Sequence, residues 1–173
     1  MYNTAQGREM GIGFKLKHYL FNAFREIFVH HHGSLEFRAK LFTLMIAVDE
    51  NFSDENFTIV QDLGLQIYEG DKDRANLLLL TTKELVRKVH DDNGLTIDTL
   101  IASIQHELKM LPRYAKKIET TSLRPLLAFT QDADTILYQE NILEFLDKLK
   151  YETLHTQKYA IDESEKNNKY NIK

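Results

Sequence analysis

Hydrophobic residues recur three and four positions apart along almost the whole chain, which is the spacing of one face of an α-helix. The alternation of apolar and polar residues that indicates a half-buried strand is not sustained. Only two Pro and seven Gly punctuate the 173 residues, which is too few turn signals for an all-β protein of this length. The pattern predicts an all-α fold: a single compact domain of six to eight helices with no sheet.

The first half of the pattern divides into helices at residues that favour helix ends. The first is predicted over residues 14–30 and ends before Gly33, and Ser34 is expected to cap the second. Ser53 is expected to cap the third, with Asp54 in its first turn. The apolar stripe of the second helix consists of Phe37, Leu41, Leu44, Met45 and Val48, and that of the third consists of Phe57, Val60, Leu63 and Ile67.

The fourth predicted helix covers Lys72 to His90 and contains four consecutive leucines. Because the four leucines leave little of the helix surface polar, this helix is predicted to be the central one, with Leu78, Leu79 and Leu80 largely in the core. The remaining helices are expected from Thr96 to Leu111, from Ser122 to about Gln131, and from about Leu137 past Tyr151.

The helical domain is predicted to occupy residues 14–160. Residues 1–13 precede the first helical stripe and are expected to form a flexible N-terminus. Residues 161–173 are polar, rich in Asn and Lys, and have almost nothing to bury. They are expected to form a polar tail or the start of a linker.

An internal similarity emerges when the sequence is shifted by 85 residues. Asp49, Phe52, Glu55 and Asn56 then coincide with Asp134, Leu137, Glu140 and Asn141. Each segment contains an apolar helix, an Asp, an apolar residue three positions later and a new helix with Glu in its first turn. The match predicts two helical hairpins related by a pseudo-twofold axis, with their acidic turns close together.

The carboxylates of these two turns are the candidate site residues. In one interpretation, Asp49, Glu55, Asp134 and Glu140 converge as oxygen ligands for a divalent cation. In the other, each carboxylate interacts with the positive end of its own helix, and no metal is involved. Both interpretations stay open at this stage.

Composition limits the remaining chemistry. The absence of Cys excludes disulfides, thiolate nucleophiles and cysteine zinc sites, and it fits a reducing compartment. A net charge of −4 supplies no global field for a phosphate backbone, so nucleic-acid binding is not expected. Arg113, Lys116, Lys117 and Arg124 form a basic cluster without interleaved aromatic residues, which favours a solvated face.

The N-terminal region has neither a secretion signal nor an apolar run long enough to span a bilayer, so a cytoplasmic location is expected. Residues 14–30 combine Lys15, Lys17 and Arg25 with a Phe- and Leu-rich apolar face. Three roles stay open for this amphipathic segment: association with an anionic membrane surface, packing against the domain, or formation of a homodimer.

The segment LFTLMIAVDENFSDENFTIVQDL, residues 41–63, resembles the TerB-like tellurite-resistance family. The family pattern is an apolar helix, Asp-Gly, an apolar residue, Ser or Thr, and one or two Glu that open the next helix. LLAFTQDADTILYQENILEFLDKL, residues 126–149, resembles a second copy. Glu50 and Thr135 replace the family's Gly, and Tyr138 replaces its capping Ser or Thr. The resemblance implies an all-helical domain whose acidic surface binds divalent metal.

A domain related to this family precedes the J domain of DjlA-like co-chaperones, although this chain has no His-Pro-Asp motif of its own. The resemblance therefore implies a non-enzymatic interaction or sensing domain of a bacterial stress or co-chaperone system, with a protein partner. Two alternatives stay open. One is a metal-dependent hydrolase that uses the clustered carboxylates, and the other is a purely structural dimerisation domain.

Overall fold

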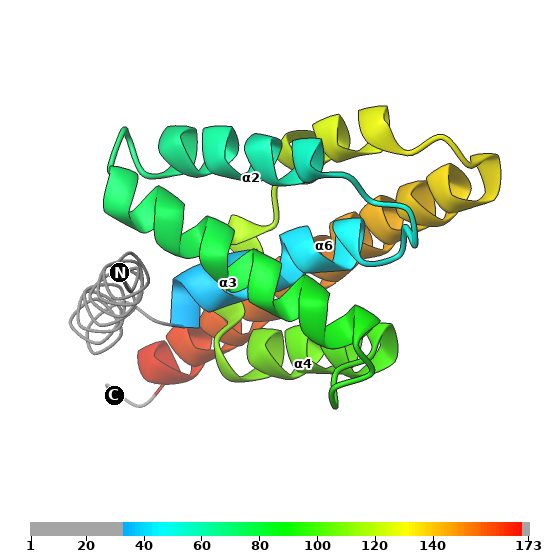
Figure 1. Cartoon of the computed structure of the whole chain (residues 1–173). Coiled ribbons are helices and arrows are strands. Elements are labelled where there is room, and N and C mark those ends of the chain that lie inside the picture. Colours follow the sequence, from blue (N-terminus) through cyan, green and yellow to red (C-terminus); the bar gives the residue numbers. More distant parts are fainter. Residues whose placement is uncertain (1–32, 171–173) are drawn as a thin grey trace, which may run out of the picture. The chain divides into compact units, whose positions relative to one another are not determined.

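The computed structural model of the chain describes residues 33–170, with side chains as far as residue 158, and every regular element in that part is a helix (Figure 1). This confirms the prediction of an all-α domain without a sheet. The elements are a helix over residues 33–46, α2 (Asp54–Ile67), α3 (Lys72–His90), α4 (Ile97–Met110), η1 (Pro112–Lys117), α5 (Thr120–Leu123), η2 (Arg124–Phe129) and α6 (Ala133–Tyr170). The two η elements are 3₁₀-helices. The predictions for residues 1–13, for the helix over 14–30 and for residues 171–173 lie outside the described residues.

The helix over residues 33–46 is the central element, and it lies among α2, α3, α4 and α6 (Figure 1). It is buried on every side along its second half, because hydrophobic residues occupy almost all its positions there. Seven of its hydrophobic side chains are at most 2 % exposed: Phe37, Ala39, Leu41, Phe42, Leu44, Met45 and Ile46. Four of the five predicted stripe residues are therefore confirmed as core, and Val48 is half-buried.

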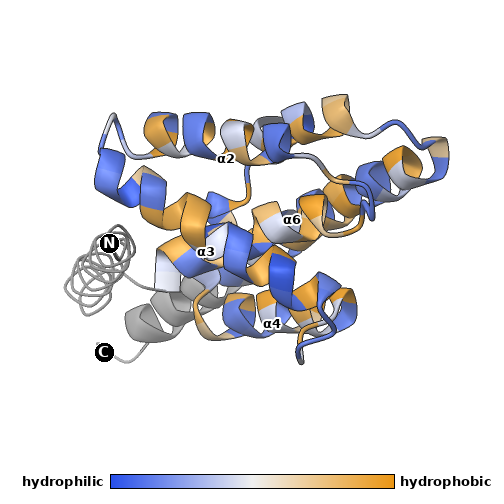
Figure 2. Ribbon diagram, viewed as in Figure 1, coloured by the Kyte–Doolittle hydropathy of each residue, from blue (hydrophilic) through white to orange (hydrophobic). Residues whose placement is uncertain are grey.

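The prediction that the leucine-rich helix is central was wrong. In α3, Leu78 is fully buried, Leu79 is half-buried and Leu80 is 38 % exposed. Successive residues of a helix point about 100° apart, so four leucines in a row cannot all face one side. The hydropathy colouring of α3 accordingly alternates between apolar and polar around the helix (Figure 2).

Close contact between α2 and α3 depends on Gly64. A Cβ atom at this position would lie 3.1 Å from the Ala75 Cα and 3.2 Å from its Cβ. Both distances are tighter than ordinary van der Waals contact, so the two helices approach as closely as they do because two small residues face each other. α2 begins after Ser53 and α3 spans Lys72–His90, both as predicted.

Several predicted helix boundaries were wrong. Gly33 and Ser34 are already helical, since an isolated Gly costs a helix only about 1 kcal/mol. Ser122 lies inside α5 rather than before it, and Pro125 stands in η2, where the chain winds as a 3₁₀-helix. The predicted second hairpin therefore lacks the long first helix of its counterpart.

The last helix begins earlier and ends later than predicted. It starts at Ala133, because Asp132 caps it: the Asp132 Oδ2 accepts hydrogen bonds from the Thr135 N–H at 2.8 Å and the Thr135 hydroxyl at 2.7 Å. It continues to Tyr170, so residues 161–170, which were expected to be a polar tail, are helical. Extending an existing helix costs little, even for a polar sequence.

Helix 33–46 is joined to α4 by an ionic contact around Lys40. Its ammonium donates hydrogen bonds to Glu107 and, at 3.1 Å, to the Ser103 hydroxyl, and it lies 3.1 Å from Glu36. Burial alone would lower the pKa of Lys40, but the hydrogen bonds to Glu107 and Glu36 raise it. The contact fixes which face of α4 meets the central helix. In the described part of the chain, no helix is long and apolar enough to cross a membrane.

Candidate functional site

The four predicted metal ligands differ in their surroundings. Asp49 is buried, and its Oδ1 accepts a hydrogen bond from the Asn51 N–H at 2.9 Å. Glu55, Asp134 and Glu140 are all exposed. Within residues 33–158, no three His, Asp or Glu side chains are grouped so that they could hold a metal ion. The shared metal site therefore stays a prediction without a ligand cluster to support it.

Buried hydrogen bonds nevertheless join the chain segments beside the two turns. The fully buried Gln139 donates from Nε2 to the Met45 carbonyl at 2.8 Å, while its Oε1 accepts from the Thr130 hydroxyl at 3.0 Å. Asn56, which is also buried, lies 3.4 Å from the Leu126 carbonyl through its Nδ2. The two regions are therefore tied together through amides and carbonyls, and the contact does not involve the predicted carboxylates.

The first turn, residues 47–53, is closed by an aromatic side chain. Phe52 is half-buried and meets Phe57 edge-on, with ring centres 5.7 Å apart. Its other neighbour is His90 at the end of α3, at 4.8 Å. The Ser53 N–H donates to the Asn56 side-chain oxygen at 3.0 Å and so fixes the start of α2. This turn therefore presents little apolar surface.

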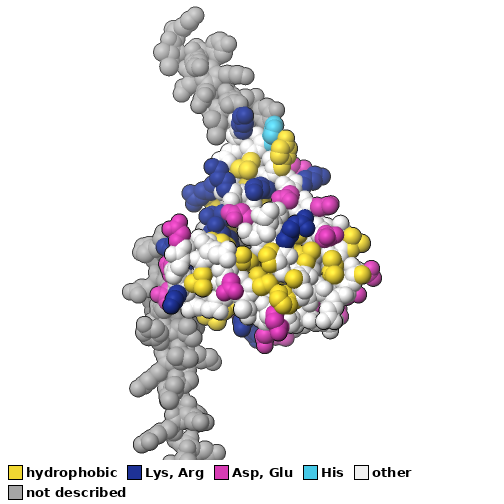
Figure 3. Space-filling view, turned by 90° about the horizontal axis from the view of Figure 1, so that it is seen from above, with side chains coloured by type: hydrophobic (Ala, Val, Ile, Leu, Met, Phe, Trp, Pro, Cys, Tyr) yellow, Lys and Arg dark blue, Asp and Glu magenta, His cyan; other side chains and the backbone are white. Residues whose placement is uncertain are grey.

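In the second turn, residues 130–132, no apolar side chain of the described residues packs over the turn as Phe52 does in the first. Because α6 starts at Ala133, Leu137 already lies inside a helix and cannot fold back over the turn. Leu137 is 57 % exposed, Tyr138 46 % and Phe129 39 %. We call these three residues the open-turn surface. Figure 3 shows hydrophobic side chains gathered on the face of the molecule that carries α2 and η2, with acidic and basic groups around them.

Carboxylates at both turns act as helix-end groups. A hydrogen bond from the Ser53 side chain holds the pKa of Glu55 below its ordinary value. Hydrogen bonds from the Thr135 hydroxyl and N–H likewise lower the pKa of Asp132. Both observations favour the interpretation of the acidic turns as helix-end chemistry, and Asp132 was not among the residues predicted for the site.

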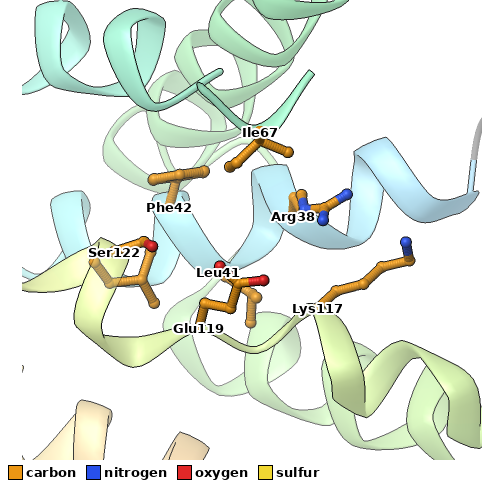
Figure 4. Close-up of a pocket in the computed structure, with 8 residues that line it drawn as sticks. Arg38, Leu41, Phe42, Ile67, Lys117, Glu119 and Ser122 are labelled. Atoms are coloured by element: carbon orange, nitrogen blue, oxygen red, sulfur yellow. The ribbon is translucent and has the colours of Figure 1, made fainter. Parts of the chain in front are cut away.

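A second candidate region is a small notch between helix 33–46, α5 and η1 (Figure 4). Its floor is formed by Leu41, Phe42, Ile67 and Leu123. Arg38 and Lys117 line it from two different elements, and no carboxylate of the described chain lies within ion-pair distance of either. The sequence placed Lys117 in a solvated basic cluster, and Arg38 was missed because it lies 79 positions earlier.

The comparisons with known proteins gave no relative. No family model matches the chain, and neither the curated proteins nor the solved structures include a match.

Proposed function

We propose that this domain is a non-enzymatic protein-interaction module that binds a partner protein through the open-turn surface. The observation that carries the proposal is the exposure of Phe129, at the end of η2, and of Leu137 and Tyr138, in the first turns of α6, on the two sides of one short turn. Contiguous exposed apolar residues mark protein-binding sites more often than isolated ones do. Tyr and Phe are also enriched at such interfaces.

A rigid support beneath the surface favours the same proposal. The hydrogen bonds of Gln139 tie the first turns of α6 to Met45 and Thr130, so Leu137 and Tyr138 project from a helix that is fixed to the core. A fixed surface loses little conformational entropy when a partner binds it. The alternative of a metal-dependent hydrolase would instead need converging ligands, and no three His, Asp or Glu side chains among residues 33–158 are grouped to hold a metal ion.

The resemblance to TerB-like domains extends the proposal to a cellular setting. We propose a role in a bacterial stress or co-chaperone system, in the manner of the domain that precedes a J domain. The support is the all-α fold together with the two turn segments quoted above. A reading frame that contains this chain and encodes no J domain would remove the co-chaperone assignment and leave the interaction surface untouched.

Site-specific photocrosslinking in living cells tests the surface. Benzoylphenylalanine replaces Tyr138 in one variant and Leu80 in a control variant, since Leu80 is an exposed apolar residue on α3. We expect one discrete crosslinked protein from position 138, absent from position 80 and lost when Leu137→Glu is added. Equal crosslinking at both positions would overturn the proposal. A crosslink only to a second copy of the chain would favour the dimerisation alternative.

A further inference from the structure

The notch beside helix 33–46 brings two cations together over an apolar floor, and nothing in the proposed function uses it. Arg38 comes from the central helix, and Lys117 from the end of η1. In Figure 4 their nitrogen-bearing ends lie to the right of the opening, Phe42 lies to the left, and Ile67 lies above it. We infer that this notch binds the carboxylate group of a monoanionic ligand that has a small apolar body.

The charges of the lining favour an anion. Arg38 makes no ion pair with any described carboxylate, and its guanidinium carbon instead lies 5.7 Å from the centre of the Tyr68 ring. Burial lowers the pKa of Lys117, and the positive charges of Arg38 and Arg113 lower it further. Cations that repel each other in a partly buried place gain from an anion between them.

The net charge of the residues that line the notch favours a ligand with a single negative charge. Glu119 also lines the notch, so two cations and one carboxylate leave one positive charge uncompensated. A doubly charged phosphate would meet the repulsion of Glu119 without a third cation in the lining. The Ser122 hydroxyl, which makes no hydrogen bond to a described residue, is available to donate to one carboxylate oxygen.

The size of the notch limits the apolar body. Its volume is about 20 Å³, by a measure on which one water molecule needs about 10–15 Å³. That space accommodates a methyl or ethyl group, with the carboxylate at the charged rim. Two sources supply such a group: a free short-chain carboxylic acid, or the C-terminal carboxylate of a protein that ends in a small residue such as alanine.

Titrations followed by amide chemical shifts in the intact chain test the inference. The probes are propionate, propionamide, inorganic phosphate, and a peptide ending in alanine with either a free or an amidated C-terminus. The variants are Arg38→Gln and Lys117→Gln, with Lys116→Gln as the matched control, because Lys116 is an exposed neighbour that does not line the notch. Circular dichroism checks that each variant is folded.

We expect saturable shifts with propionate or with the free peptide, centred on residues 38–42 and 117–123. Affinity should fall about tenfold or more in Lys117→Gln, as expected for the loss of one charge-assisted hydrogen bond, and should be unchanged in Lys116→Gln. Tighter binding of the free peptide than of propionate, lost on amidation, identifies a protein C-terminus as the source. Tighter binding of propionate identifies a small acid.

Any of the following results would overturn the inference. One is the absence of saturation with both propionate and the free peptide. Another is equal binding of propionate and propionamide, or tighter binding of phosphate than of either carboxylate. The third is a Lys117→Gln variant that is folded and keeps its affinity. Since Lys117 and Tyr138 lie on separate elements, failure of this site leaves the photocrosslinking result unaffected.

Discussion

The turn after the central helix and the turn before α6 occupy matching positions in the 85-residue internal similarity. They differ in whether an apolar side chain packs over the turn. In the first, Phe52 packs between Phe57 and His90. In the second, the matching residue Leu137 is 57 % exposed. The difference arises because α6 begins before Leu137 and α2 begins after Phe52. A shift of the helix start along the chain turns a buried apolar position into an exposed one.

The helical segments that precede the two turns also differ in burial, and the second is again the more exposed. Leu44 lies in a continuous helix and is fully buried, whereas the matching Phe129 ends a short 3₁₀-helix and is 39 % exposed. The α5 and η2 segment, which contains Pro125, winds too irregularly to bury as many side chains as the central helix does. Two segments with similar apolar patterns therefore differ in burial: the first is buried almost throughout its second half, whereas the second buries Leu123 and Leu126 and leaves Phe129 exposed.

The largest expected effect comes from truncating the matched pair Leu44 and Phe129. Leu44→Ala removes a fully buried side chain and should lower the free energy of unfolding by about 2–5 kcal/mol. Phe129→Ala should lower it by less, about 1–2 kcal/mol, because Phe129 is already 39 % exposed to water. Urea denaturation of the two variants measures both values. Similar losses would show that Phe129 is packed as tightly as Leu44.

A smaller difference is expected between Phe52 and Leu137 themselves. Phe52→Ala should destabilise by about 1–2 kcal/mol, since it removes contacts with two aromatic rings from a half-buried place. Leu137→Ser should change stability by no more than about 0.5 kcal/mol, as for other exposed positions. Thermal unfolding of both variants is the measurement. A large loss for Leu137→Ser would place that residue in a packed environment and remove the open-turn surface.

The helix-end carboxylates allow a titration in which each turn serves as control for the other. Hydrogen bonds lower the pKa of Glu55 at the first turn and of Asp132 at the second. Ser53→Ala should raise the pKa of Glu55 and leave Asp132 unchanged, while Thr135→Val should raise the pKa of Asp132 alone. Carboxyl carbon shifts followed by NMR against pH give both values.

The sign of the pH dependence follows from the lowered pKa values. An Asp whose pKa is lower in the folded than in the unfolded chain contributes stability above the ordinary value of 3.8, and this contribution is lost as pH falls through the folded pKa. Thr135→Val should therefore remove part of the acid sensitivity of unfolding below that value. Unchanged titration of Asp132 in Thr135→Val would contradict the hydrogen bond that the Thr135 hydroxyl donates to Asp132.

The smallest effect is expected from divalent cations. Because the described carboxylates form no cluster, millimolar calcium, magnesium, manganese or zinc should move the unfolding midpoint by no more than about 1 °C. The double variant Asp49→Asn/Asp134→Asn is the control. A clear rise in the midpoint that the double variant abolishes would restore the shared metal site.

The fold was largely predictable from the sequence, because it depends on local signals. Apolar spacing and the caps Ser53 and Thr96 gave the order of helices and the limits of α2, α3 and α4 within one or two residues. The wrong helix was predicted to be central, because a run of leucines indicates how apolar a segment is but does not indicate how many elements surround it. Only the tertiary arrangement shows that residues 33–46 are enclosed and that Leu80 is not.

The candidate sites were less predictable, because they depend on where helices start and on residues far apart in the chain. The sequence contains the capping pair Asp132 and Thr135. A prediction based on this pair would start α6 at residue 133 and would place Leu137 inside the helix, away from the turn. The pairing of Arg38 with Lys117 had no sequence signal, since it arises only when η1 meets the central helix.

We expect the partner to bind the open-turn surface specifically, and not exposed apolar residues in general. The most direct measurement is the affinity of the partner captured at position 138 for two purified variants, Leu137→Glu and Leu80→Glu, each of which adds one charge at an exposed leucine. We expect Leu137→Glu to weaken binding at least about tenfold, because an interface core excludes unpaired charge, and Leu80→Glu to leave the affinity within about twofold. Equal affinities for the two variants would contradict this expectation.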